Sequence, residues 1–350
     1  MFSRFQSTAA FAAVFLSVLV SEACAIDYGT PVKTGDFPSV GHLQVKTGGN
    51  HAVYGTGTLL APNVVLTAAH VVQEAPTPGS ITVKIDLGTD RVFLSKVVVY
   101  RTNPHYLNLK GDSVIAEEER NYMDADMLFC SASDLAILLL EKSVPESFGI
   151  DYYPLAETDP KKGQEATAVG FGIDEGRKNT RKLSGTLEFL RTHDRALLFR
   201  TPKGSAQRTD HGDSGGPLLI KQGNSYKMAA ITHGFYTAIR IDGLAPDEYG
   251  IYVSIAQHRE WIEKVKGQLE KYKAPSGDLY YLARTNQKSP FPAMTGHQVF
   301  SLAKIDTPLE RLVNRIFTRG INEPIPEDIA KAWQNRYKLP PGMLVPVKAE

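Results

Sequence analysis

Short apolar stretches separated by Gly, Pro, Asn and Asp follow one another from Ile26 to about Tyr272. This pattern is typical of short antiparallel strands, so we predict an all-β barrel or sandwich. The polar segment Asn103–Met127 interrupts the pattern and predicts a long surface loop. Apolar residues at helical spacing then predict one closing helix. The expected strand cores are Val64–Leu66, Val97–Tyr100, Leu135–Leu140, Ala166–Val169, Leu197–Phe199, Pro217–Ile220 and Met228–Ile231, and the helix should bury Ile255, Ile262, Val265 and Leu269.

The pattern changes after Lys271. The stretch Ala274–Gly277 contains Pro, Ser and Gly, which indicates a linker. Two helices are predicted beyond it, one starting at Asp306–Pro308 and one at Pro326–Asp328, because each start combines an acid with a first-turn proline. We therefore divide the chain into a β domain at 26–272 and a mostly helical extension at 273–350 of unknown role. We expect the extension to pack against the β domain.

The first 25 residues have the features of a signal peptide. Arg4 precedes the apolar run Ala9–Val20, and the small residues of Ala23–Ala25 offer a cleavage site. The alternative is a membrane anchor, but this run is shorter than the roughly 20 residues that a spanning helix needs. We expect cleavage after Ala25, no membrane span in the mature chain, and a secreted or periplasmic protein.

Composition narrows the function classes further. The chain is 42% apolar and 22% charged with a formal net charge of +1, so no general attraction to nucleic acid is expected. The two cysteines are Cys24 and Cys130, and cleavage would remove the first, which leaves no intramolecular disulfide. We expect Cys130 to be a buried thiol, with a reactive cysteine as the alternative. The histidines have no ligand-like spacing, so neither a metal nor a cofactor is predicted.

The strongest local motif is Gly212-Asp213-Ser214-Gly215-Gly216-Pro217. A serine hydroxyl becomes a useful nucleophile when a neighbouring base takes its proton, and backbone N–H groups must stabilise the resulting oxyanion. Glycines allow the sharp turn that presents both, and the expected oxyanion donors are the N–H groups of Gly212 and Ser214. The alternative is a glycine-rich turn with an incidental serine.

Two further segments could complete a catalytic group. His70 ends Leu66-Thr67-Ala68-Ala69-His70, and histidine is the natural base near neutral pH. Asp134 leads the apolar run Leu135–Leu140, where a partly buried carboxylate would need a partner such as the imidazole N–H of His70. Each residue alone could be structural, and Asp124 and Asp126 are nearby acids that do not lead a strand.

The order His70, Asp134, Ser214 resembles that of the chymotrypsin/trypsin-like serine peptidases, over roughly Ile26 to Lys264. Five other segments are similar to family motifs: Gly57–Leu60, Val169–Gly172, Thr232–Gly234, Gly250–Tyr252 and Trp261–Ile262. The resemblance implies two six-stranded antiparallel β-barrels with the active site between them, a closing C-terminal helix, and hydrolysis of protein or peptide substrates by a Ser-His-Asp triad.

The resemblance also implies roles for individual residues. Ile26 begins Ile-Asp-Tyr-Gly, which is similar to the start of mature trypsins, so its freed ammonium would pair with Asp213 and shape the oxyanion hole. The alternative is that Ile26 is an ordinary strand residue. Thr232, Gly234 and Gly250 would line the substrate cleft, with Arg208 at the base of the primary pocket.

The sequence is compatible with three substrate preferences. An unpaired Arg208 would favour cleavage after Glu or Asp, since an uncompensated buried charge is costly. If Asp210 or another acid neutralises Arg208, an apolar pocket for Leu, Phe or Tyr results, and a basic preference is the third possibility. Val71, Asp210 and His233 stand where the family has cysteine, cysteine and tryptophan, so the pocket walls are expected to differ.

Two rival functions remain. One is an inactive homologue that binds a partner through the same cleft. The other is a chaperone-protease with a C-terminal peptide-binding domain, which the composition of the tail and Asp213 disfavour, because those enzymes have asparagine at that position.

Overall fold

The computed structural model describes residues 26–48, 51–73, 75–88, 91–103, 106, 132–172, 181–193, 195–223, 225–234, 249–272, 279–282, 325–326, 331 and 344–346. The predicted signal peptide, both cysteines and almost all of the polar segment 103–127 lie outside these residues, as do nearly all residues of the two predicted C-terminal helices. Within the described part of the chain, no helix is both long and apolar enough to cross a membrane.

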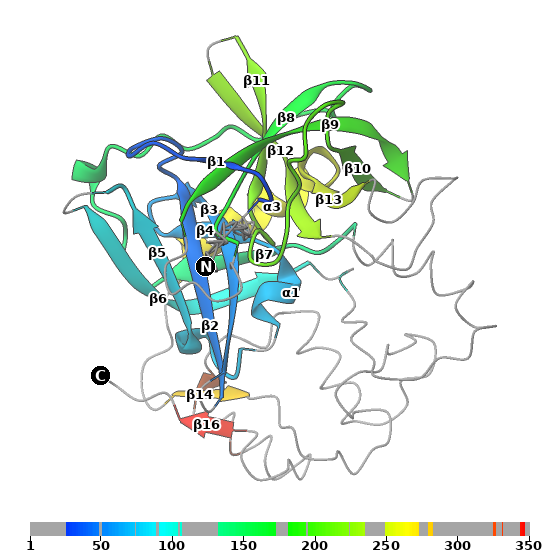
Figure 1. The fold of residues 1–350 in the computed structure, drawn as a ribbon. Coiled ribbons are helices and arrows are strands. Elements are labelled where there is room, and N and C mark those ends of the chain that lie inside the picture. Colours follow the sequence, from blue (N-terminus) through cyan, green and yellow to red (C-terminus); the bar gives the residue numbers. More distant parts are fainter. Residues whose placement is uncertain are drawn as a thin grey trace, which may run out of the picture.

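Six antiparallel strands close the first barrel in the order β2-β3-β4-β7-β6-β5 (Figure 1, blue to blue-green). The short helix α1 follows β4, and the 3-10 turn η1 precedes β5. The strand β5 alternates buried and partly exposed residues, as expected when one face of a strand packs into a barrel. The elements are β2 (Val40–Gly48), β3 (His51–Ala61), β4 (Val64–Thr67), α1 (Ala69–Val72), η1 (Pro78–Ser80), β5 (Ile81–Asp86), β6 (Val92–Thr102) and β7 (Ala136–Leu140).

The second barrel is built in the same way from the later strands (Figure 1, green to yellow). Its order is β9-β10-β13-β12-β11-β8, and pairing of β8 with β9 closes the ring, while the short β1 adds to β9. The 3-10 turn η2 lies between the barrels in sequence. The elements are β1 (Thr30–Pro31), η2 (Glu146–Phe148), β8 (Glu165–Gly170), β9 (Leu183–His193), β10 (Ala196–Arg200), β11 (Pro217–Gln222), β12 (Ser225–Gly234) and β13 (Gly250–Ser254). The predicted fold of two six-stranded antiparallel barrels is therefore confirmed.

The helix α3 (Ile255–Glu270) directly follows β13 and packs against β4, β7 and β12. Its buried face contains all four predicted residues and also His258. The side chain of Ser254 caps the helix by accepting a hydrogen bond from the Gln257 N–H at 3.0 Å. Because β4 and β7 have the barrel on one side and α3 on the other, both strands are buried throughout, which agrees with sequences that are apolar except for Thr67.

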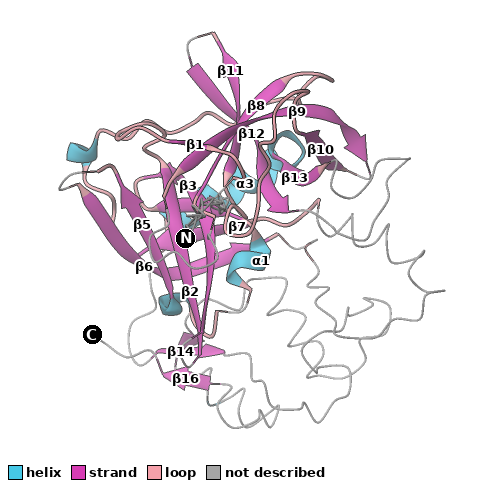
Figure 2. Cartoon of the chain, viewed as in Figure 1, coloured by secondary structure: helices cyan, strands magenta, loops and turns pink. Residues whose placement is uncertain are grey.

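Apart from Lys331, the described residues of the extension form a small antiparallel sheet with the order β15-β14-β16 (Figure 2). It consists of β14 (Leu279–Leu282), β15 (Ile325–Pro326) and β16 (Leu344–Pro346). None of these strands was predicted, and β15 includes Pro326, which was expected to begin a helix. Three separate segments form this sheet, and pairing between such distant segments cannot be predicted from local sequence patterns.

Candidate active site

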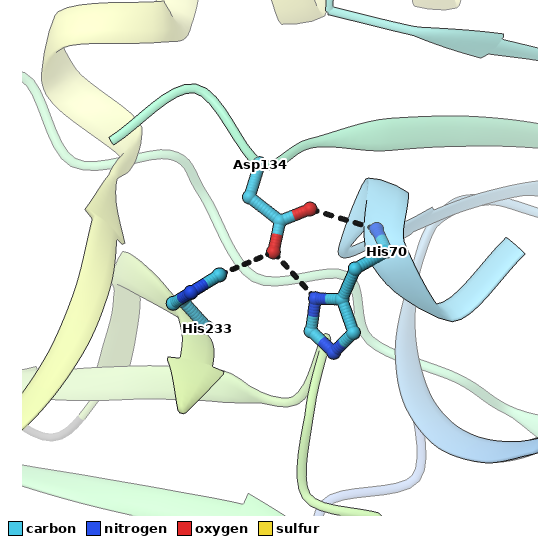
Figure 3. Close-up of side chains that lie close together, drawn as sticks. All are labelled: His70, Asp134 and His233. Atoms are coloured by element: carbon cyan, nitrogen blue, oxygen red, sulfur yellow. Dashed lines mark hydrogen bonds and ion pairs between the residues drawn. The ribbon is translucent and has the colours of Figure 1, made fainter. Parts of the chain in front are cut away.

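Strand pairing in the first barrel brings His70 and Asp134 together. Strand β4 pairs with β7 so that Leu66 lies opposite Ile137, and the two polar residues lie just beyond the paired segments. Asp134 Oδ1 accepts the His70 backbone N–H at 2.8 Å, and Oδ2 lies 2.5 Å from His70 Nδ1 (Figure 3). Asp134 is fully buried, whereas the His70 side chain is 25% exposed. The histidine is therefore fixed through both its backbone and its ring.

A second imidazole reaches the same carboxylate oxygen. His233 Nδ1 also lies 2.5 Å from Asp134 Oδ2, so two histidines converge on one acid (Figure 3). The rings of His70 and His233 are 5.4 Å apart and meet edge to face at 79°. The sequence placed His233 where the family has tryptophan, and it gave no expectation that the ring would contact Asp134.

The protonation state of Asp134 follows from these contacts. Burial would raise the pKa of the Asp134 carboxyl, but His70 and His233 oppose it with favourable charge interactions and hydrogen bonds. Their combined effect holds the pKa well below its usual range, so the carboxylate is ionised at neutral pH. An ionised carboxylate can only accept hydrogen bonds, so both Nδ1 atoms must carry the proton. A neutral His70 then has its basic lone pair on Nε2.

The Ser214 loop is held by contacts from both barrels. From the first barrel, Thr56 donates its backbone N–H to the Ser214 carbonyl at 2.8 Å and its hydroxyl to the Gly212 carbonyl at 2.9 Å. From the second barrel, the Thr232 carbonyl accepts the Gly215 N–H at 2.8 Å. Gly212 and Gly215 have φ angles of +90° and +82°, a region that favours glycine. The glycines of the motif thus allow the predicted sharp turn.

The Ser214 hydroxyl donates to the backbone carbonyl of His233 at 3.3 Å. Within the described residues, no hydrogen bond joins this hydroxyl to His70. Catalytic hydrogen bonds are often long in unliganded proteins and shorten when substrate binds. The structure therefore brings His70 to Asp134, and brings Ser214 to the residue that also contacts Asp134.

Asp213 is a buried carboxyl surrounded by backbone donors. Its Oδ2 accepts the N–H groups of Ile26 at 2.8 Å and Asp210 at 2.9 Å, and its Oδ1 accepts that of Gly172 at 3.0 Å. Burial raises the pKa of Asp213 to about 7, although these three hydrogen bonds oppose the rise. The structure thus brings together Ile26 and Asp213, the two residues of the expected activation pair.

The residues expected to bind substrate occupy different environments. Arg208 Nε lies 2.6 Å from Asp27 Oδ2, and its side chain is 58% exposed. The other expected residues belong to strands. Thr232 and Gly234 lie in β12, where Thr232 is buried and Gly234 partly exposed, and Gly250 begins β13. Thr209, next to Arg208, bonds to the Tyr252 hydroxyl at 2.8 Å, and a side-chain carbon added at Gly250 would contact that same tyrosine. Arg208 is thus neutralised by an acid other than Asp210.

Sequence reasoning gave no sign of the contact made by His233. The pairing of β12 with β13 shifts register between Thr232 and Gly234, so a bulge occurs at His233. A bulge re-aims a side chain relative to the simple alternation of a strand. Neither spacing nor residue type along β12 would have revealed this shift.

The cluster of His70, Asp134 and His233 also has the donor types of a metal site, and its ligand atoms lie within 4.8 Å of one another. Zinc bonds of about 2.0–2.1 Å in a tetrahedron would separate neighbouring donor atoms by about 3.3 Å. The two N···O distances of 2.5 Å are shorter and match hydrogen bonds to an ionised acceptor. The arrangement therefore fits protons between these atoms better than a metal ion.

Comparison with known proteins gives a consistent result. The family model described as Trypsin matches residues 26–262. "Mast cell protease 2" of Meriones unguiculatus is 25% identical over 273 residues, which cover 72% of this chain and 95% of that protein. "Trypsin delta" of Drosophila erecta is 22% identical over 251 residues, covering 67% of this chain and 85% of that protein. "CLIP domain-containing serine protease B14" of Anopheles gambiae is 30% identical over 118 residues, which are 29% of this chain and 30% of that protein. The chain belongs to the trypsin family of serine proteases.

Proposed function

We propose that the chain is a serine endopeptidase that hydrolyses peptide bonds in proteins through an acyl-enzyme. Ser214 is the nucleophile, His70 the general base and acid, and Asp134 the residue that orients His70. The observation that supports this proposal most strongly is the pair of hydrogen bonds from His70 to the buried Asp134 carboxylate. They fix the imidazole with Nε2 as its basic atom, as the reaction requires.

The reaction begins when the Ser214 hydroxyl attacks the substrate carbonyl carbon and passes its proton to His70 Nε2. The ionised Asp134 stabilises the imidazolium that forms. His70 then gives this proton to the departing amine, which leaves an ester between Ser214 and the acyl part of the substrate. Water then attacks the ester carbon and gives a proton to the same Nε2. His70 returns this proton to Ser214 Oγ as the bond between Oγ and the acyl carbon breaks, which releases the acid and restores the serine.

The tetrahedral intermediates need donors for their negative oxygen. We assign this role to the backbone N–H groups of Gly212 and Ser214. Within the described residues, neither N–H donates to a protein acceptor, which leaves both available to a substrate. The turn that presents them is held on one side by Thr56 and on the other by Thr232, so the donors need little rearrangement during the reaction.

We also propose that residues 1–25 direct export and are removed, so that the mature protein begins at Ile26 and is secreted or periplasmic. Its freed ammonium would keep the contact that the Ile26 nitrogen already makes with Asp213. In this scheme, export itself activates the enzyme.

The test is hydrolysis of a denatured protein by the purified chain, with Ser214→Ala as the matched control. We expect peptide release by the parent and a loss of at least about 10³-fold in the variant, because the nucleophile is removed with little change in volume. Binding of substrate without hydrolysis by both proteins would instead indicate an inactive homologue that acts as a binding protein.

A further inference from the structure

His233 contacts both ends of the proposed catalytic group. Its ring Nδ1 lies 2.5 Å from Asp134 Oδ2, and its backbone carbonyl accepts the Ser214 hydroxyl at 3.3 Å. One residue of the second barrel thus bonds to the acid of the first barrel and to the serine of its own barrel. The His233 side chain is only 16% exposed, so its ring lies largely within the protein.

The backbone around His233 is fixed on both sides. The preceding residue, Thr232, donates its N–H to the Gly216 carbonyl and accepts the Gly215 N–H, each at 2.8 Å. The following residue, Gly234, pairs with Ile251 across the register shift in β12 and β13. Because the same hydrogen bonds tie the Ser214 loop to β12, the position of His233 is coupled to that of the proposed nucleophile.

The Asp134 carboxylate is held from several directions. Oδ1 accepts a hydrogen bond from the His70 backbone N–H, and Oδ2 accepts one from Nδ1 of His70 and one from Nδ1 of His233. A carboxylate oxygen has two lone-pair directions, so two donors can occupy both directions of Oδ2. With both occupied, rotation of the carboxylate would break a hydrogen bond to a buried charge, which is costly.

We propose that His233 is a positioning residue of the active site, which donates Nδ1–H to Asp134 and thereby holds the carboxylate in the orientation that fixes His70. This inference rests on the proposed peptidase function. His233 acts through Asp134 and is not assigned a contact with substrate or with the reacting atoms through its side chain. Its loss should therefore lower kcat and leave KM nearly unchanged.

Asparagine and glutamine offer a matched pair of substitutions. In histidine, Nδ1 is bonded to Cγ, and in asparagine the amide nitrogen is also bonded to Cγ. His233→Asn therefore keeps an N–H donor close to the position that faces Asp134. His233→Gln has the same functional group one carbon further out, so its N–H cannot occupy that position. His233→Ala removes the donor altogether.

We expect kcat to fall by about 10- to 100-fold in His233→Ala and His233→Gln, the effect of one hydrogen bond to a charged group. His233→Asn should recover most of this loss, and KM should stay within about twofold of the parent value in all three. Equal kcat in the Ala variant and the parent, or no difference between Asn and Gln, would overturn the proposal. Thermal unfolding of each variant checks that it folds, and the Asn–Gln comparison remains informative if the Ala variant does not.

A spectroscopic measurement tests the contact independently of catalysis. In the proton NMR spectrum of ¹⁵N-histidine-labelled protein, we expect two strongly deshielded Nδ1 protons, of which His233→Asn removes one and Asp134→Asn shifts both. A single such resonance in the parent would contradict the contact even if the enzyme is active. If the parent shows both resonances but neither hydrolyses peptides nor reacts at Ser214, the peptidase function fails and with it the positioning role, while the contact stands.

Incubation of the parent with a chelator distinguishes a metal site. We expect unchanged kcat and unchanged Nδ1 proton resonances after chelation. Loss of activity that added Zn²⁺ restores would show that the three side chains hold a metal, and would overturn the positioning role.

Discussion

The backbone nitrogen of Ile26 lies 2.8 Å from the buried carboxylate of Asp213, 187 positions further along the chain. The Ile26 side chain is completely buried, so this end of the β domain is anchored inside the second barrel. Because Asp213 immediately precedes Ser214, the contact connects the proposed new N-terminus to the proposed oxyanion hole.

This contact predicts where the active protein begins. We expect N-terminal sequencing of active material to read Ile-Asp-Tyr-Gly, and retention of Ala25 to lower activity, since a peptide N–H has no charge to pair with Asp213. The reason is that an ammonium in this buried site can form an ion pair with the carboxylate. Full activity of a form that begins elsewhere would refute activation at Ile26.

The raised pKa of Asp213 predicts how stability depends on pH when Ala25 is retained. The pKa is about 7 in the folded chain and lower in the unfolded chain, so the folded state binds more protons between these values. The stability from this group is therefore complete below the unfolded pKa near about 4, falls as pH rises, and stops falling above about 7. In protein that retains Ala25, urea denaturation of the Ser214→Ala variant should show this fall in the free energy of unfolding. The double variant Ser214→Ala with Asp213→Asn should not show it. Parallel pH profiles of the two variants would contradict the assignment.

The turn at Ser214 predicts a contrast between two glycines. Gly215 and Gly204 have φ angles of +82° and +85°, so alanine meets a similar backbone penalty at both. At Gly215 the added carbon would overlap the Thr56 carbonyl oxygen and the Thr67 hydroxyl, whereas at Gly204 nothing lies within 4 Å. We expect Gly215→Ala to lower the free energy of unfolding by about 2 kcal/mol more than Gly204→Ala, with loss of activity. Equal melting curves would show that the turn adjusts freely.

The pairing of Arg208 predicts the residue that precedes the cleaved bond. Its charge is neutralised by Asp27 and its side chain is largely exposed, so Arg208 does not present an unpaired charge to an acidic side chain of the substrate. The adjacent Thr209 and Tyr252 are neutral and bonded to each other. We expect kcat/KM for peptides with Phe or Leu immediately before the cleaved bond to exceed kcat/KM for peptides with Glu or Arg there by at least about tenfold.

The control for this prediction is Arg208→Gln, which should keep the same order of substrates. Rapid cleavage after Glu that disappears in Arg208→Gln would mean that Arg208 reaches the substrate.

Features that depend on local sequence could be predicted, and those that depend on distant contacts could not. The helix α3 was predicted because Ile255, Ile262, Val265 and Leu269 lie on one helical face, and all four are buried. Strand positions were predicted from apolar segments bounded by turns, since local alternation and length determine them. The contact between Asp134 and His70 was anticipated because a carboxylate beside an apolar strand needs a partner.

Two contacts at the site lay beyond such reasoning. Arg208 pairs with Asp27 across 181 positions, and nothing near either residue indicates the other. His233 contacts Asp134, which lies 99 positions earlier in the chain, because a bulge in β12 redirects its side chain. The alternation of apolar and polar residues in the sequence does not reveal such a bulge. Both contacts change the expected chemistry, one by neutralising a charge and the other by adding a donor to the buried acid.

The central claim is that His70, held by Asp134, makes Ser214 nucleophilic. A fluorophosphonate probe tests it directly, because the probe phosphonylates an activated serine and leaves ordinary hydroxyls unmodified. Mass spectrometry of the digested protein should find one adduct, on Ser214, which His70→Ala reduces by at least about 10³-fold. An unmodified Ser214 in the folded parent beginning at Ile26, or labelling that does not depend on His70, would contradict the account.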